Sequence, residues 1–181
     1  MKKAINNILI TGRPGIGKTT LIRKISEHLS ETKPVGFYTK EIKEHGSRKG
    51  FELIGFSGNR GILSHVNIRS PYKVGKYKVD LEGFEIFLDG LTLGGDSANL
   101  IIIDEIGKME CFSSSFRKLI RKILNSNKFF IATVSLKGSG FIDEIKRRDD
   151  IELMLLTEDN RNVLLFDVLK KFHILSTRQH M

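Results

Sequence analysis

Residues 12–19 read Gly12-Arg13-Pro14-Gly15-Ile16-Gly17-Lys18-Thr19 and fit the pattern G-x-x-x-x-G-K-[ST]. The glycines let the backbone curl so that successive N–H groups point at one anionic ligand. Lys18 adds a compact positive charge, and the Thr19 hydroxyl is an oxygen ligand suited to a magnesium ion. This combination indicates a loop that binds the phosphate chain of a nucleotide together with Mg²⁺.

The segments on either side of this loop have the periodicity that the motif requires. The preceding residues, Asn7 to Thr11, predict a short buried strand. From Thr19 to Leu29 the apolar residues recur on one face of a helix. The amino terminus of that helix would present the positive end of its dipole to the loop. We therefore expect nucleotide contacts from Gly12 through Thr20.

A pair of acidic residues, Asp104-Glu105, follows the apolar run from Leu100 to Ile103. Such runs are typical of parallel strands covered on both faces, and the carboxyl ends of these strands border the ligand crevice. We expect Asp104 and Thr19 to hold Mg²⁺, and Glu105 to orient or deprotonate the attacking water. With Lys18, the two carboxylates form the expected catalytic set. The nucleotide contacts expected in this segment are Asp104, Glu105, Ile106 and Gly107.

Strand-like and helix-like segments alternate along the chain, which favours a three-layer α/β fold with a mostly parallel sheet. We interpret residues 1–181 as one domain of the P-loop class. The expected strands are Asn7–Thr11, Gly36–Lys43, Phe51–Phe56, Asn99–Asp104, Lys128–Ser135 and Ile151–Leu156, with shorter ones between Gly61 and Val79. The expected helices are Thr19–Leu29, one capped by Ser113 or Ser114, Phe141–Arg148, and Glu158–Leu175.

The composition indicates the cellular compartment of this domain and the charge of its partners. Hydrophobic residues make up 40% of the chain, which is enough for a core, but no apolar run is long enough to cross a bilayer. Cys111 is the only cysteine, so no disulfide can form within the chain, and we expect a cytoplasmic protein without membrane contact. The net charge of +9 suits either polyanionic nucleotides or nucleic acid. Because the basic residues are spread along the chain, we favour the first interpretation.

Beyond these motifs, most of the sequence resembles the THEP1 family of small nucleoside-triphosphatases. The resemblance rests on Gly36-Phe37-Tyr38-Thr39-Lys40-Glu41, on Gly46, Arg48, Gly50 and Phe51, on Arg60-Gly61, on Val74-Gly75-Lys76-Tyr77, on Asp104-Glu105-Ile106-Gly107-Lys108-Met109-Glu110, and on Asn160-Arg161. It implies hydrolysis of ATP, GTP and other nucleoside triphosphates, with loose selectivity for the base. It also implies a RecA-like sheet with a β-hairpin, in which the strand Lys128–Val134 separates the phosphate-loop strand from the acidic one.

The resemblance draws attention to five further positions. Arg48 and Arg161 match the family and are candidate contacts for phosphate. Lys108 is close in sequence to the acidic pair and is a third candidate. Two residues depart from the family pattern: His65 stands in place of arginine, and Ser135 in place of histidine or proline.

Two other functions use the same loop and stay open at this stage. A nucleoside or nucleotide kinase would need an acceptor pocket and a mobile arginine lid. A nucleic-acid-dependent ATPase would fit the positive charge. A switch-type GTPase is disfavoured, because Asn127-Lys128-Phe129-Phe130 lacks the aspartate of N-K-x-D and because Glu105 could supply a base. The sequence specifies neither the physiological nucleotide nor the oligomeric state.

We expect Lys18→Ala to remove nearly all turnover and to leave the fold intact. The lysine supplies a positive charge at the β- and γ-phosphates, where negative charge must be stabilised in the transition state. Steady-state phosphate release measures the effect, and circular dichroism of the same sample checks folding. A folded variant with near-wild-type activity would show that the loop has been misread.

Overall fold

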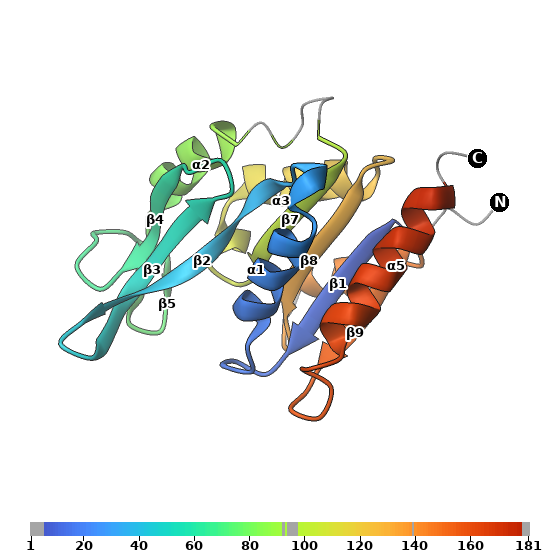
Figure 1. The fold of residues 1–181 in the computed structure, drawn as a ribbon. Helices are drawn as coiled ribbons and strands as arrows, with labels where there is room; N and C mark the ends of the chain where they lie inside the picture. The colour runs from blue at the N-terminus through green and yellow to red at the C-terminus, as the bar shows by residue number, and fades with distance from the viewer. Residues whose placement is uncertain (1–5, 92, 94–97, 139, 179–181) are drawn as a thin grey trace.

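The central sheet of the computed structural model combines a parallel half with an antiparallel half. The structure describes residues 6–91, 93, 98–138 and 140–178. Within these residues, nine strands form one sheet in the order β5-β6-β4-β3-β2-β7-β8-β1-β9 (Figure 1). The five strands from β2 to β9 in this order are parallel. The strand bounds are β1 Asn7–Gly12, β2 Val35–Glu44, β3 Ser47–Gly55, β4 Arg60–His65, β5 Lys73–Val74, β6 Tyr77–Val79, β7 Leu100–Ile106, β8 Phe129–Ser135 and β9 Ile151–Leu156.

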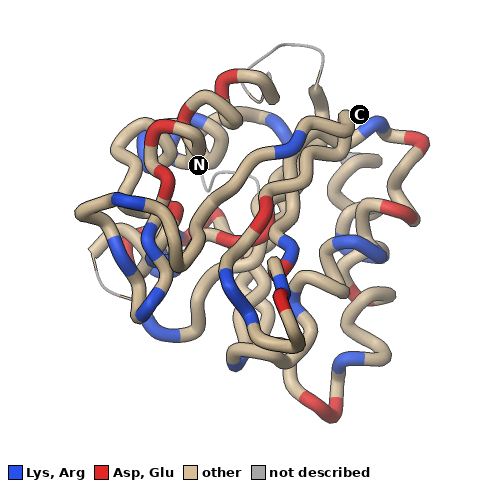
Figure 2. The backbone as a smooth tube through the Cα atoms, turned by 90° about the vertical axis from the view of Figure 1, so that its left-hand side faces the viewer, with Lys and Arg blue, Asp and Glu red and all other residues tan. Residues whose placement is uncertain are grey.

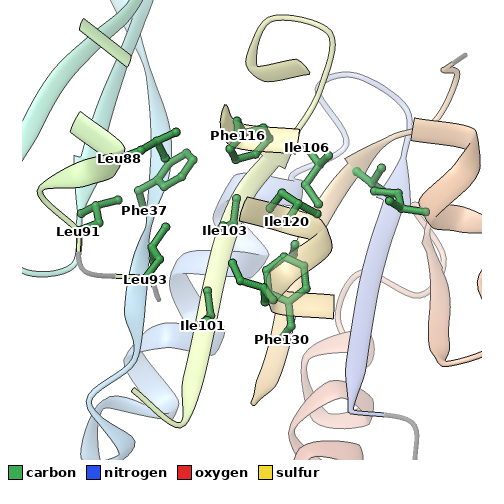
Figure 3. Close-up of a cluster of buried hydrophobic side chains, with 14 of the residues drawn as sticks. Phe37, Leu88, Leu91, Leu93, Ile101, Ile103, Ile106, Phe116, Ile120 and Phe130 are labelled. Atoms are coloured by element: carbon green, nitrogen blue, oxygen red, sulfur yellow. The ribbon is translucent and has the colours of Figure 1, made fainter. Parts of the chain in front are cut away.

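Helices cover both faces of the sheet and make the three expected layers (Figure 1). On one face, α1 (Lys18–His28) and α5 (Leu164–Arg178) bury their apolar residues with β1, β7 and β8. On the other, α2 (Leu81–Asp89), α3 (Ser114–Leu124) and α4 (Phe141–Lys146) pack over Phe37, Ile103 and Phe130 (Figure 3). Two single-turn 3₁₀ helices, η1 (Ser30–Thr32) and η2 (Glu110–Phe112), complete the described elements.

The strand order confirms the RecA-like arrangement. Strand β8 pairs in parallel with β1 on one side and with β7 on the other. The loop after β1 and the acidic pair at the end of β7 therefore lie at the same edge of the sheet, one strand apart. Strand β9 pairs with the free side of β1 and places the turn after Leu156 beside the phosphate loop.

The predicted hairpin is formed by β2 and β3, and it is longer than expected. Only Val35, Gly36 and Phe37 of β2 pair with β7, and the rest of β2 continues with β3, which in turn pairs with β4, as an arm of the antiparallel half (Figure 1). Gly36 permits this docking: its φ is 140°, and a Cβ there would lie 1.8 Å from the carbonyl oxygen of Ile102. The register places Thr39 just beyond the paired segment, at the edge that carries the phosphate loop.

Two helical segments differ from the sequence-based expectation. Helix α2 was not expected, although Asp80 accepts a hydrogen bond from Gly83 N and Phe84, Phe87 and Leu88 have helical spacing. The last helix begins at Leu164 and not at Glu158. Asn160 is the reason, because its side chain accepts the N–H of Thr157 and donates to the carbonyl of Leu155. These bonds close a turn and compete with helix formation. Among the described helices, none combines the length and hydropathy needed to cross a membrane.

Candidate functional site

The loop between β1 and α1 has the conformation of an anion-binding turn. Gly15 and Gly17 have φ values of 78° and 107°, which residues with a side chain rarely adopt. Gly17 ends the loop at the N-cap of α1, whose first turn carries no acidic residue. The positive end of the helix dipole therefore faces the loop without a competing carboxylate from the helix itself. Gly12 is required for space, since a Cβ there would lie 2.8 Å from the carbonyl oxygen of Leu156.

Asp104 is the centre of the site and has no exposed surface. Hydroxyls from three different elements donate to its carboxylate. Thr19 of α1 bonds to Oδ2 at 2.6 Å and Thr39 of β2 to the same oxygen at 3.2 Å. Thr133 of β8 bonds to Oδ1 at 2.5 Å. The carboxylate thus ties the phosphate-loop helix, the hairpin arm and the intervening strand to the end of β7.

The electrostatic balance at Asp104 favours a nearby cation. Burial is the largest influence and raises its pKa, and the negative charge of Glu105 acts in the same direction. The hydrogen bonds from Thr133 and Thr19 oppose this rise but do not cancel it. A positive ion beside the carboxylate would lower the pKa and stabilise the charged form.

Glu105 is partly exposed and bridges the phosphate loop and the end of β8. Its Oε2 lies 3.4 Å from the Lys18 ammonium, which also donates to the carbonyl of Gly12 at 3.3 Å. Its Oε1 accepts a hydrogen bond of 2.7 Å from Ser135. Lys146 of α4 supports this arrangement by donating to the backbone carbonyl of Ser135.

Behind Glu105 lies a second glutamate that the sequence analysis did not single out as a site residue. Glu110 begins η2 and is 5% exposed. Its Oε2 accepts the backbone N–H of Gly107 at 3.1 Å. Burial, followed by the charge of Glu105, raises the Glu110 pKa to about 8. This side chain is therefore a neutral acid at pH 7.

Comparison with known proteins assigns the family. A family model described as NTPase matches residues 7–169. The chain is 47% identical to nucleoside-triphosphatase THEP1 of Thermotoga sp. (strain RQ2) over 163 residues, which cover 90% of this chain and 92% of that protein. This chain belongs to the THEP1 family. The THEP1-family protein is therefore a hydrolase of the nucleoside-triphosphatase type.

Relatives of this THEP1-family protein extend to mammals and to solved structures. It is 39% identical to the human cancer-related nucleoside-triphosphatase over 178 residues, covering 90% of this chain and 94% of that one. The crystal structure of THEP1 from Aquifex aeolicus superposes with a TM-score of 0.82 at 36% identity. That match covers 92% of this chain and 98% of the Aquifex chain.

The fold of the THEP1-family protein brings five of the expected site residues together. These are Gly12, Lys18, Thr19, Asp104 and Glu105. In the rest of the loop, Arg13, Pro14 and Gly15 are exposed, as is Thr20, whereas Ile16 packs partly against the apolar cluster beneath α1. The Ile106 side chain is buried in the opposite core, so it could meet a nucleotide only through its backbone. Gly107 N–H is engaged by Glu110.

The three further basic candidates lie on three different segments of the chain, and among the described residues only Arg48 has a charged partner. Arg48 donates to Glu41 at 2.6 Å and to the Tyr77 hydroxyl at 2.9 Å, and its guanidinium stacks over Phe51. These contacts tie Arg48 to the hairpin arm and to Tyr77 of β6, and the charge of Glu41 partly offsets its own. Lys108 is exposed next to Gly107, and Arg161 is exposed in the turn closed by Asn160 and not at a helix start.

Four polar residues of the site escaped the site analysis of the sequence: Thr39, Thr133, Ser135 and Glu110. Thr39 and Glu110 stood within the family motifs, and Ser135 was noted only as a departure from the family pattern. Their roles depend on contacts between strands and turns that lie far apart in sequence.

The other departure from the family pattern, His65, lies on β4, where its Nε2 is 3.7 Å from Glu44 of the hairpin arm. Cys111 is half-buried, and burial raises its thiol pKa to about 12, as befits an unreactive thiol.

The raised pKa of Glu110 predicts a pH-dependent loss of stability. A carboxyl whose pKa rises from 4.5 in the unfolded chain to about 8 in the folded one stabilises the fold fully below pH 4.5. That contribution is lost as the pH rises towards 8. Because glutamine stays neutral, the variant Glu110→Gln does not lose this contribution. The difference in melting temperature, variant minus wild type, should therefore increase from pH 5 to pH 9. Thermal melts of both proteins across this range provide the measurement, and a constant difference would contradict the assignment.

Proposed function

We propose that this protein hydrolyses nucleoside triphosphates, ATP and GTP among them, to the diphosphate and phosphate in a magnesium-dependent reaction. One observation carries the proposal: two side chains of the phosphate loop meet the two carboxylates at the end of β7. Thr19 bonds to Asp104, and Lys18 pairs with Glu105. Each pair joins a phosphate-binding residue to a group that can act on metal or water.

The donor set around Asp104 fits Mg²⁺. This ion prefers oxygen ligands, keeps several waters, and is usually bound by one or two carboxylates together with substrate phosphates. The Thr19 hydroxyl donates a hydrogen bond to Asp104, and its oxygen retains lone pairs that can bind a cation. Among the described residues there is no group of three or more His, Cys, Asp or Glu side chains that could hold a metal without such help. Thr19 and Asp104 would hold the Mg²⁺ ion, which would supply positive charge to offset that of the phosphates.

The contact between Lys18 and Glu105 suggests how substrate prepares the base. A triphosphate in the loop offers Lys18 a denser negative charge than one carboxylate does, so the lysine turns towards the β- and γ-phosphates. Glu105 keeps its hydrogen bond from Ser135 and is released to face a water molecule. The water oxygen bonds to the γ-phosphorus, the bond from that phosphorus to the β–γ bridging oxygen breaks, and Glu105 accepts the water proton.

Two alternatives have less support in the structure. A cavity of about 580 Å³ lies between the carboxyl-terminal end of α1 and the start of β2. Its lining includes Ser26, Lys33 and Val35. It is at the other end of the parallel strands from Asp104, so it cannot serve as a kinase acceptor pocket beside the γ-phosphate.

The second alternative is a nucleic-acid-dependent ATPase. Figure 2 shows acidic residues interspersed among the basic ones, which favours attraction of nucleotides over a dedicated nucleic-acid face. Incubation with nucleosides, and with RNA or DNA at several salt concentrations, tests both alternatives.

Removal of divalent metal should stop hydrolysis, and Mg²⁺ added in excess over the chelator should restore it. Thr19 and Asp104 are the proposed contacts, and phosphate charge would otherwise remain unneutralised. Phosphate release is measured in EDTA and again after Mg²⁺ is returned. Undiminished turnover in EDTA would exclude the proposed metal site.

Glu105→Gln should lose hydrolysis and retain nucleotide binding. Glutamine still accepts the hydrogen bond from Ser135 but lacks the basicity needed to take a proton, and general bases contribute typically ~10²–10⁴-fold. Single-turnover hydrolysis and titration with a fluorescent triphosphate measure the two properties.

Asp104→Asn is the matched comparison and should in addition weaken magnesium-dependent binding. If Glu105→Gln hydrolysed normally while Asp104→Asn did not, the base would have to lie elsewhere. If both variants matched wild type, the acidic pair would have no part in the reaction.

A further inference from the structure

Glu110 is a buried carboxyl that the proposed reaction does not yet use. It has no direct place at the phosphate loop, and its hydrogen bond goes to the backbone of Gly107. The charged groups that face it across the turn are Glu105 and Asp104, both of which disfavour its ionisation, and none of the described ion pairs includes it. A buried acid in such surroundings costs stability, so its presence calls for a physical explanation.

The space around Gly107 shows what Glu110 adjoins. A Cβ at residue 107 would lie 2.8 Å from Glu110 Oε2, 3.0 Å from Glu105 Oε1 and 3.3 Å from Ser135 Oγ. The two carboxyls and the hydroxyl therefore converge on one small volume, which is open because residue 107 has no side chain. Gly107 has no positive φ, so a side chain here would act through space, by displacing the ends of these three side chains, and not through backbone strain.

The two glutamates that border this volume have different charged neighbours. Glu105 has the Lys18 ammonium 3.4 Å from its other oxygen, whereas no ion pair among the described residues includes Glu110. Two carboxylates this close repel each other, and burial together with the charge of Glu105 favours the neutral form of Glu110. Neutral Glu110 can accept the Gly107 N–H without placing a second negative charge behind Glu105.

Further hydrogen bonds connect the turn from Glu105 to Ser113 around this bond. Cys111 N–H donates to the carbonyl of Gly107 at 3.1 Å, and Ser113 N–H donates to that of Glu110 at 3.1 Å. Arg117 of α3 adds a further bond to the carbonyl of Cys111. The Glu110 carboxyl closes this turn at the end that carries Glu105.

We propose that Glu110 is a positioning residue for hydrolysis: through the N–H of Gly107 it fixes the turn after β7, so that Glu105 lies between Lys18 and Ser135. This inference rests on the proposed role of Glu105 as the base. Loss of the Glu110 acceptor would misplace the base and leave the phosphate loop unchanged.

Two substitutions of Glu110 distinguish loss of the oxygen that accepts the Gly107 N–H from a mere change of side chain. Glu110→Gln keeps a carbonyl oxygen for Gly107 N–H and should retain kcat within about threefold at pH 7, because positioning and not charge is needed. Glu110→Met has similar length but no acceptor of that kind. Its kcat should fall on the order of tenfold to a hundredfold, the range expected when a catalytic group is misplaced. Affinity for a fluorescent triphosphate should be unchanged in both.

Glu85→Met is the control for a purely structural effect. Glu85 accepts a bond of 2.5 Å from Ser113, which caps α3, but it lies on α2 and is not one of the three side chains nearest to Gly107. Its loss should lower the melting temperature and leave kcat unchanged. Gly107→Ala is a second test of the shared space, since the added methyl would displace both carboxyl ends, and its kcat should fall as in Glu110→Met.

A wild-type kcat in folded Glu110→Met or in Gly107→Ala would overturn the inference. A loss in Glu110→Gln as large as that in Glu110→Met would do the same, because the negative charge would then be the property that matters. If Glu105→Gln abolishes hydrolysis while Glu110→Met does not change it, only the inference about Glu110 fails. Normal hydrolysis by Glu105→Gln would instead remove the proposed base itself.

Discussion

The Asp104 carboxylate and the hydroxyls that surround it are the constraint on which the rest of the site depends. A carboxylate with no exposed surface is stable only if hydrogen bonds or a cation replace the lost water. Thr19, Thr39 and Thr133 supply the hydrogen bonds from a helix, the hairpin arm and the neighbouring strand. The charge that remains uncompensated is the feature that makes this position suitable for a metal ion.

The sheet order makes this convergence possible. Strand β8 lies between β1 and β7, so Thr133 meets Asp104 from the side and Ser135, two residues later, meets Glu105. The hairpin contributes through Thr39, which reaches Asp104 because Gly36 allows β2 to approach β7 closely. We therefore regard the hairpin as part of the site and not only as an appended arm.

The parts of the site that could be predicted from the sequence are those encoded by short contiguous segments. The loop from Gly12 to Thr19 and the apolar run before Asp104 each predict their local structure from their own residues. Two such motifs at the carboxyl ends of parallel strands must lie at the same edge of the sheet. That β8 lies between them was implied by the family resemblance alone, and the strand pairing confirms it.

The remaining features depend on distant contacts or on competition between local structures. Thr39 and Thr133 look like ordinary strand residues until the sheet brings them to Asp104. Gly83 in the first turn of α2 obscures a helix whose apolar residues are otherwise correctly spaced. Asn160 delays the start of α5 through bonds that a helical periodicity cannot reveal.

A structure of the wild-type protein with Mg²⁺ and a non-hydrolysable triphosphate tests the central claim most directly. The account predicts that Lys18 leaves Glu105 for the β- and γ-phosphates, that the metal contacts Thr19 and reaches Asp104 directly or through water, and that Glu105 holds a water facing the γ-phosphorus. A structure in which Lys18 stays on Glu105, or in which the γ-phosphate faces an acceptor pocket and not that water, would contradict it.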